Sequence, residues 1–168
     1  VLPLSVRKRS AEFTDYLGEN GLVDALDLRE RLGESEEAAI ERYSKWAKAI
    51  IEVASSESGV SNQLWSESIG HTLEIVPRKN PYRMRAGEVL PVTVFFKGKP
   101  VSGATIKAGT DDRSVRLPVV ATNRQGNAEI RLVSEGRWYF RALHLNRLDD
   151  DPEAQWESFW STLTFQIF

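Results

Sequence analysis

The sequence contains no cysteine, which excludes disulfides, thiolate metal sites and cysteine nucleophiles together. No apolar run approaches the roughly 20 residues that a membrane-spanning helix needs, so we expect no transmembrane segment. The formal net charge of −2 argues against nucleic acid as the main partner, because such partners usually require a basic surface. We also expect no secretory signal within this sequence, since residues 1–4 are too short for its apolar core. Residues 1–6 are typical of the end of a strand, and we expect a piece of a longer protein.

The common catalytic motifs are missing as well. There is no Gly-x-Ser-x-Gly elbow, and Ser68 and His71 are three residues apart on an expected strand, with well-separated side chains. The glycines lack the strand–loop–helix setting of a phosphate-binding loop. The acidic clusters 111–112 and 149–151 could supply an acid and a base, although solvated turn residues explain them more simply. We therefore predict that the protein is not an enzyme.

A helical pattern covers residues 10–54. The first helix is expected to end at the pair Asn20-Gly21 and the second at Gly33. Ser35 is a suitable N-cap for a third, longer helix, in which apolar residues recur every three to four positions. These apolar residues are Ile40, Tyr43, Trp46, Ala47, Ile50, Val53 and Ala54. The polar run at 55–59 then indicates a flexible linker.

Beyond this linker the hydrophobic period falls to two, which is typical of strands. We expect seven strands near residues 71–76, 89–97, 103–109, 115–121, 127–132, 137–145 and 158–167. Buried residues should alternate with solvated ones, as in Trp138, Phe140 and Ala142 against Arg137, Tyr139 and Arg141. The predicted fold class is α+β: an N-terminal helical segment, then a seven-stranded antiparallel immunoglobulin-like or transthyretin-like β-sandwich. The predicted domains are a helical linker segment at 1–58 and the β-sandwich at 59–168.

The two histidines suggest a metal site. Strand parity places His71 and His144 on inward-facing sides, and alternating strand directions bring them to one end of the sandwich. The loop 149–153 and Glu157 should lie at the same end. The candidate metal ligands are His71, His144, Asp149, Asp150, Asp151 and Glu157. Imidazoles with carboxylates suit nickel, cobalt, copper or zinc. The simpler alternative is that each histidine donates to a backbone carbonyl, and a third alternative is recognition of something organic.

Tryptophans cluster near the last two expected strands. Trp138, Trp156 and Trp160 are most simply explained by core packing. An exposed Trp156 or Trp160 would instead indicate a docking surface for a partner protein or a sugar.

Several segments, in this order, resemble a bacterial family classed as domain of unknown function 4198. The matching segments are residues 10–22, 41–48, 70–77 (Gly-His-Thr-Leu-Glu-Ile-Val-Pro), 80–82, 98–104, 122–126, 136–142 and 156–160. The Gly-Lys-Pro-Val-Ser-Gly-Ala stretch at 98–104 is also similar to transthyretin-like and carboxypeptidase-regulatory-like domains.

The resemblance implies a periplasmic or otherwise extracytoplasmic location and a longer parent with a further N-terminal β-domain. It also implies a label that some members carry, that of a periplasmic component of cobalt or nickel uptake. No catalytic residues are carried over. Two functions follow as expectations: an exported accessory domain that binds a transition metal, or a structural module that contacts proteins of the cell envelope. A third, carbohydrate binding, would need an exposed aromatic platform next to polar groups.

Overall fold

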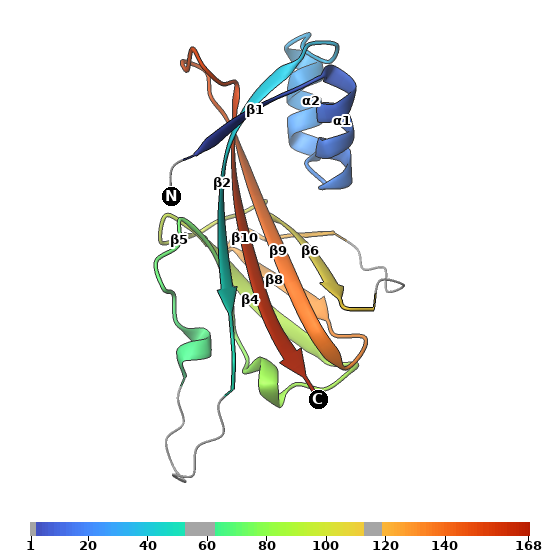
Figure 1. The fold of residues 1–168 in the computed structure, drawn as a ribbon, viewed down its shortest axis with the longest axis vertical. Helices are drawn as coiled ribbons and strands as arrows, with labels where there is room; N and C mark the ends of the chain where they lie inside the picture. The colour runs from blue at the N-terminus through green and yellow to red at the C-terminus, as the bar shows by residue number, and fades with distance from the viewer. Residues whose placement is uncertain (1–2, 53–62, 113–118) are drawn as a thin grey trace. The chain divides into compact units, whose positions relative to one another are not determined.

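The computed structural model describes residues 3–52, 63–112 and 119–168, which are mainly β with two short α-helices (Figure 1). The helices are α1 (Ser10–Glu19) and α2 (Val23–Arg31), and two 3₁₀ turns are η1 (Leu64–Ser66) and η2 (Pro81–Arg83). The strands are β1 (Leu4–Lys8), β2 (Ala39–Ala49), β3 (Leu73–Pro77), β4 (Val89–Phe96), β5 (Lys99–Pro100), β6 (Thr105–Thr110), β7 (Val120–Ala121), β8 (Asn127–Arg131), β9 (Gly136–Arg147) and β10 (Trp156–Ile167).

The strands form two sheets. The larger sheet has the order β1-β2-β10-β9-β6-β7, and the smaller has β3-β4-β5 with β8 paired to β4. The β1–β2, β3–β4 and β4–β8 pairs are antiparallel. β2 and β10 run in the same direction, because Gln155 N donates to Ile40 O near their starts and Ile50 N donates to Thr164 O near their ends (Figure 1). The expectation of a purely antiparallel arrangement is therefore wrong at this pair.

Most of the expected strands are confirmed. β3, β4, β6, β8, β9 and β10 begin and end within two residues of the predicted limits. The strand expected at 115–121 falls largely outside the described residues, and β7 covers Val120–Ala121. Both short helices end where the breakers predict: Gly21 and Gly33 follow them with φ of 70° and 72°, a left-handed conformation that glycine adopts without strain.

The predicted third helix is wrong, because Ala39–Ala49 forms strand β2. Its backbone pairs with β1, and Leu4 lies opposite Tyr43. Ala39 and Glu41 are buried two residues apart, as in a strand, but the next buried residue is Ser44, three positions further on. The buried positions therefore do not keep a period of two, and their spacing resembles that of a helix. Ser35 caps no helix; its carbonyl accepts a 2.7 Å hydrogen bond from Ser10 Oγ. Pairing with neighbouring strands outweighs the helix propensity of this segment.

The described chain divides into two compact units. Unit 1 contains Val1–Lys45 and Leu143–Trp160, and unit 2 contains Trp46–Ala142 and Ser161–Phe168. β2, β9 and β10 therefore each contribute residues to both units. The predicted domain boundary at residue 58 lies outside the described residues and stays a prediction.

Unit 1 has a small apolar core beneath its two helices. Its buried members are Phe13, Leu17, Leu22, Ala25, Ala39, Leu143 and Trp156. The buried Arg29 and the partly buried pair of Arg147 and Glu34 supplement this core. Arg29 Nη2 donates to the carbonyls of Glu34 at 2.7 Å and Glu37 at 2.9 Å, which fixes the connection between α2 and β2. Arg147 binds the Glu34 carboxylate through both Nη atoms, at 2.9 and 2.7 Å. A bidentate arginine–carboxylate pair of this kind requires a specific geometry.

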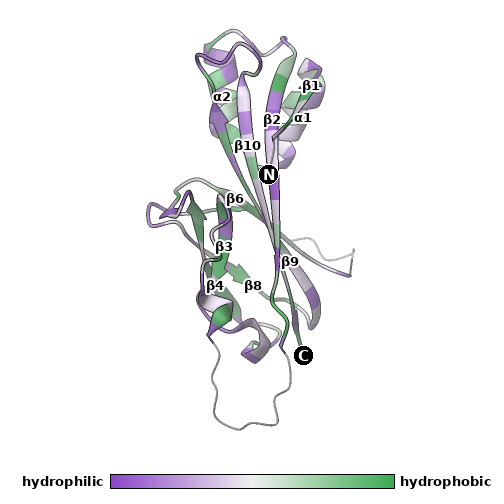
Figure 2. Ribbon diagram, turned by 60° about the vertical axis from the view of Figure 1, so that its left-hand side comes forward, coloured by the Kyte–Doolittle hydropathy of each residue, from purple (hydrophilic) through white to green (hydrophobic). Residues whose placement is uncertain are grey.

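Unit 2 contains the larger core. Apolar residues dominate β3 and β4 (Figure 2). Its fully or nearly fully buried side chains include Leu73, Ile75, Leu90, Val92, Val94, Ile106, Ile130, Leu132, Trp138, Phe140 and Phe165. The Phe140 ring packs edge-on against Trp138 and Phe165, with centroids 6.3 and 5.1 Å apart. Edge-to-face packing of this kind gives a rigid aromatic layer behind the sheet. Among the described residues, no helix has the length and apolarity needed to cross a membrane.

Candidate functional site

The six predicted metal ligands are divided between the units. His71 belongs to unit 2, and His144, Asp149, Asp150, Asp151 and Glu157 belong to unit 1. Within residues 3–52, 63–112 and 119–168, no group of three or more His, Asp and Glu side chains is arranged to hold a metal ion. A site shared by both histidines stays a prediction.

His144 lies in a mostly apolar environment. Its ring is half-buried, and its centroid is 6.5 Å from that of Phe159. Burial lowers the pKa of His144 below its usual value, although a hydrogen bond with Asn146 opposes this effect. Burial has this effect because it disfavours the charged form of the imidazole.

The acidic loop of unit 1 has structural partners. Asp151 accepts hydrogen bonds from the backbone N–H groups of Glu153 at 2.9 Å and Ala154 at 3.1 Å, and it forms an ion pair with Arg42. These contacts, the Glu153 N–H first, lower the pKa of Asp151. Asp149 is 85% exposed and lies 3.9 Å from Arg147 Nε. The simpler explanation, turn residues in water, describes this loop well.

Trp138 and Trp156 are core residues, as the simpler interpretation predicts, and Trp160 packs against the core from its edge. Trp138 and Trp156 are 1% and 2% exposed. Trp160 is half-buried, and its ring packs against Tyr16 in unit 1 with centroids 6.0 Å apart. Trp156 is therefore not exposed, and a docking surface at the half-buried Trp160 stays a prediction.

Glu74 in β3 is a buried carboxylate that sequence reasoning missed. It accepts hydrogen bonds from Lys48 Nζ at 2.6 Å and Ser68 Oγ at 2.7 Å. It also accepts from the backbone N–H groups of Ile69 at 2.9 Å and Gly70 at 3.1 Å. The signal was present in the sequence, because an acidic residue in a strand with only apolar neighbours needs several donors when it is buried.

Burial alone would raise the pKa of Glu74, but these hydrogen bonds, that from Lys48 foremost, outweigh it and lower the pKa below the usual value. Glu74 thus holds the segment before β3 in place. His71 lies in that segment, and its Nδ1 is buried without a hydrogen-bond partner among the described residues.

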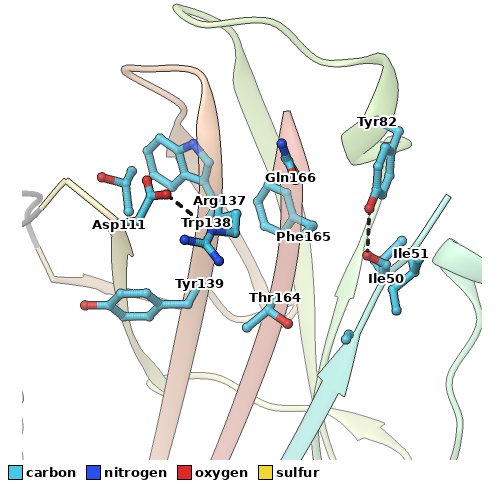
Figure 3. Close-up of a pocket in the computed structure, with 12 residues that line it drawn as sticks. Ile50, Ile51, Tyr82, Asp111, Arg137, Trp138, Tyr139, Thr164, Phe165 and Gln166 are labelled. Atoms are coloured by element: carbon cyan, nitrogen blue, oxygen red, sulfur yellow. Dashed lines mark hydrogen bonds and ion pairs between the residues drawn. The ribbon is translucent and has the colours of Figure 1, made fainter. Parts of the chain in front are cut away.

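Unit 2 also contains an open pocket of about 350 Å³ on the larger sheet (Figure 3). β9 contributes Arg137 and Tyr139, β10 contributes Thr164 and Gln166, and Ile51 follows β2. Behind the pocket lie the buried Trp138 and Phe165, so its floor is part of the core.

Tyr139 is the main feature of this pocket. Its ring extends sideways from β9 (Figure 3) and its phenol end lies over Gly109 of β6. A Cβ added to Gly109 would lie 2.6 Å from Tyr139 Cε1, closer than real atoms approach. Glycine therefore permits the ring to lie along the sheet, and Tyr139 remains 41% exposed. Glycine in a strand often marks such a close approach.

Polar groups surround the ring. Arg137 Nε lies 3.3 Å from Asp111 Oδ2, and the two side chains are 78% and 49% exposed. Across the pocket, Tyr82 donates to the Ile50 carbonyl at 3.1 Å (Figure 3). We call the surface formed by Gly109, Asp111, Arg137, Tyr139, Thr164 and Gln166 the tyrosine platform.

The family comparison agrees with the resemblance noted in the sequence. The model of the family described as domain of unknown function (DUF4198) matches residues 2–146. The chain belongs to this family. The family description names no activity, and comparisons with curated proteins and with solved structures find no match. In this DUF4198 chain, the Gly-His-Thr-Leu-Glu stretch at 70–74 ends with Glu74, whose hydrogen bonds give that motif a structural role.

Proposed function

We propose that this chain is a non-catalytic binding domain whose ligand lies on the tyrosine platform. The observation that carries the proposal is the position of Tyr139, which is laid over Gly109 and yet 41% exposed. An aromatic residue gains most by burial, so a ring held at the surface by its neighbours is suited to stacking against a ligand. The rigid layer of Trp138 and Phe165 behind it keeps the surface preorganised, which lowers the entropic cost of binding.

The polar groups on the platform support binding rather than catalysis. Asp111 is the one carboxylate among the described residues that line the pocket, and it is half-exposed and paired with Arg137. A general acid or base is usually tuned by burial, which this carboxylate lacks. Hydrogen bonding to a ligand needs no such tuning.

An extracytoplasmic location is part of the proposal. It is supported by what the resemblance noted in the sequence implies, and it is compatible with the absence of cysteine. We further propose that the sheets of unit 2 pack as an immunoglobulin-like or transthyretin-like sandwich, supported by the alternation of buried and exposed residues in β8 and β9. Fractionation of cells that express the full-length protein tests the location, and recovery in the cytoplasm would contradict it.

The binding role is tested by NMR titration of the isotopically labelled protein. The probes are neutral and acidic oligosaccharides, mononucleotides and proline-rich peptides. We expect at least one probe to shift the amide signals of residues 109–111, 137–139 and 164–166, and we expect these shifts to vanish in Tyr139→Ala. If no probe shifts those signals, the proposal is wrong.

Transition-metal handling is a second candidate, favoured by the unpartnered Nδ1 of His71. Calorimetric titration with nickel, cobalt, copper and zinc chlorides tests it, beside a His71→Ala, His144→Ala variant. Micromolar or tighter binding that the variant loses supports a role for these histidines. Absence of heat with all four metals removes this candidate and leaves the platform unaffected.

A further inference from the structure

We infer that the tyrosine platform binds an acidic saccharide, with a sugar ring stacked on Tyr139 and its acid group held by neighbouring cations. This inference rests on the proposed binding function and names its ligand class. It follows from the register between β6 and β9, from the charges that this register brings together, and from the hydrogen-bonding groups around the ring.

The register is fixed by two observations. Asp111 N donates to Arg137 O at 3.2 Å, and Tyr139 lies over Gly109. Continued one pair further along the same two strands, this register places Lys107 opposite Arg141. Successive pairs two residues apart project from the same face of a sheet. The outward face therefore carries three rows in order: Asp111 with Arg137, Gly109 with Tyr139, and Lys107 with Arg141.

The charges in these rows favour an anion. Arg137 and Arg141 flank Tyr139 along β9, each about 7 Å away by the strand rise. Lys107 adds a third cation beside them, and Asp111 is the one acidic residue in the three rows. This local excess of positive charge stands out in a chain whose net charge is −2.

The remaining groups suit the hydroxyls of a sugar. Thr164 and Gln166 on β10 face the same pocket and offer both donors and acceptors. The Tyr139 hydroxyl forms no hydrogen bond with the described residues, so it can bond to a ligand. Arg137 can bind a carboxylate through two parallel N–H groups, a geometry that lysine cannot provide. A pyranose with an apolar face, hydroxyls and a carboxylate matches these three kinds of group.

A single-stranded nucleic acid fits the surface less well. Proteins that bind single strands stack successive bases on a series of aromatic side chains. On this face the strand neighbours of Tyr139 are Arg137, Arg141 and Gly109, and none of them is aromatic. The single aromatic ring of Tyr139 can stack on one ring of a ligand, and the neighbouring cations can bind a charged group beside that ring.

Calorimetry with a hexamer of 1,4-linked galacturonate tests the inference. The matched probe is the same hexamer as its methyl ester, which keeps the backbone and loses the charge. We expect the acid to bind at least about tenfold more tightly than the ester, and its binding to weaken as salt rises. An ester that binds equally well would overturn the role of the cations.

Variants locate the contacts. We expect Tyr139→Ala to weaken binding of the acid by about tenfold or more, and Lys107→Gln to weaken it several-fold and to flatten its salt dependence. Gly109→Ala should also weaken it, because the added Cβ displaces a ring that is still present. Arg131→Gln on β8 is the matched control, since that arginine donates to the Gly87 carbonyl away from the platform, and it should bind like wild type. Circular dichroism checks that each variant is folded.

The outcomes separate this inference from the proposed function. If the acid does not bind but another NMR probe shifts the platform signals, the ligand class is wrong and the binding function stands. Tighter binding of a thymidine decanucleotide than of the acid would likewise overturn the ligand class. If no probe reaches the platform, both proposals fail.

Discussion

The buried carboxylate of Glu74 makes the sharpest prediction for stability. In Glu74→Gln the shape of the side chain is kept but its charge is lost. Lys48, whose side chain is 10% exposed, would then lack a buried counter-charge. The new amide NH₂ group would also face an ammonium group, a hydroxyl and two backbone N–H groups that all donate to the carboxylate in the wild type. Breaking a buried pair by changing one partner costs about 3–5 kcal/mol, so we expect a loss of about 3 kcal/mol.

The assay is urea denaturation at pH 7, with Glu52→Gln as the control. Glu52 makes the same kind of ion pair at the surface, 3.3 Å from Arg83, where the side chains are 42% and 76% exposed. An exposed pair of this kind contributes about 0.2–1 kcal/mol. If Glu74→Gln costs no more than this control, the network does not stabilise the fold and the reasoning is refuted.

The pH dependence provides an independent check. The pKa of Glu74 is lower in the folded protein than its usual value of 4.5. The ionised carboxylate therefore stabilises the fold fully above that value, and this contribution is lost as the pH falls through the folded pKa. We expect the difference between wild type and Glu74→Gln to be constant from pH 7 to about pH 5 and to shrink below it.

Three further predictions concern other parts of the chain. Gly18→Ala should raise the free energy of unfolding by about 0.5–1 kcal/mol in urea denaturation, because the added methyl meets nothing within 4 Å and alanine favours the helix. Phe140→Ala should lower it by about 3–5 kcal/mol by opening a cavity between Trp138 and Phe165. Burial lowers the pKa of His144, so the unfolded chain gains the proton first and stability should fall as the pH drops below 6.5. In His144→Gln that fall should be smaller, and an unchanged pH profile would contradict the assignment.

The strands of unit 2 could be predicted because their burial alternates. In β8, Ala128 and Ile130 are buried between exposed neighbours, and the sequence shows the same alternation directly. β2 could not be predicted in this way. Its buried positions do not keep a period of two, and its strand partners come from β1 and β10, which are distant in the sequence. Pattern analysis cannot detect pairing that depends on such remote segments.

Only part of the candidate site could be predicted from the sequence. Alternation in β9 predicts that Tyr139 points away from the core, and the structure confirms it. That the ring lies over Gly109 depends on the register between β6 and β9, which no local motif specifies. Glu74 was missed for a similar reason, since Lys48 reaches it from a strand assigned to a helix. In each case the missing information was which strands lie side by side.

The three strands that contribute to both units limit how the chain can be divided for experiments. A fragment that starts at residue 59 would keep β9 and β10 but lose β2, which neighbours β10 in the sheet. The exposed edge of β10 would then offer a row of unpaired N–H and C=O groups to other molecules. Deleting residues before 59 is therefore expected to yield an aggregating fragment, and binding studies need β2 on the same polypeptide as the platform.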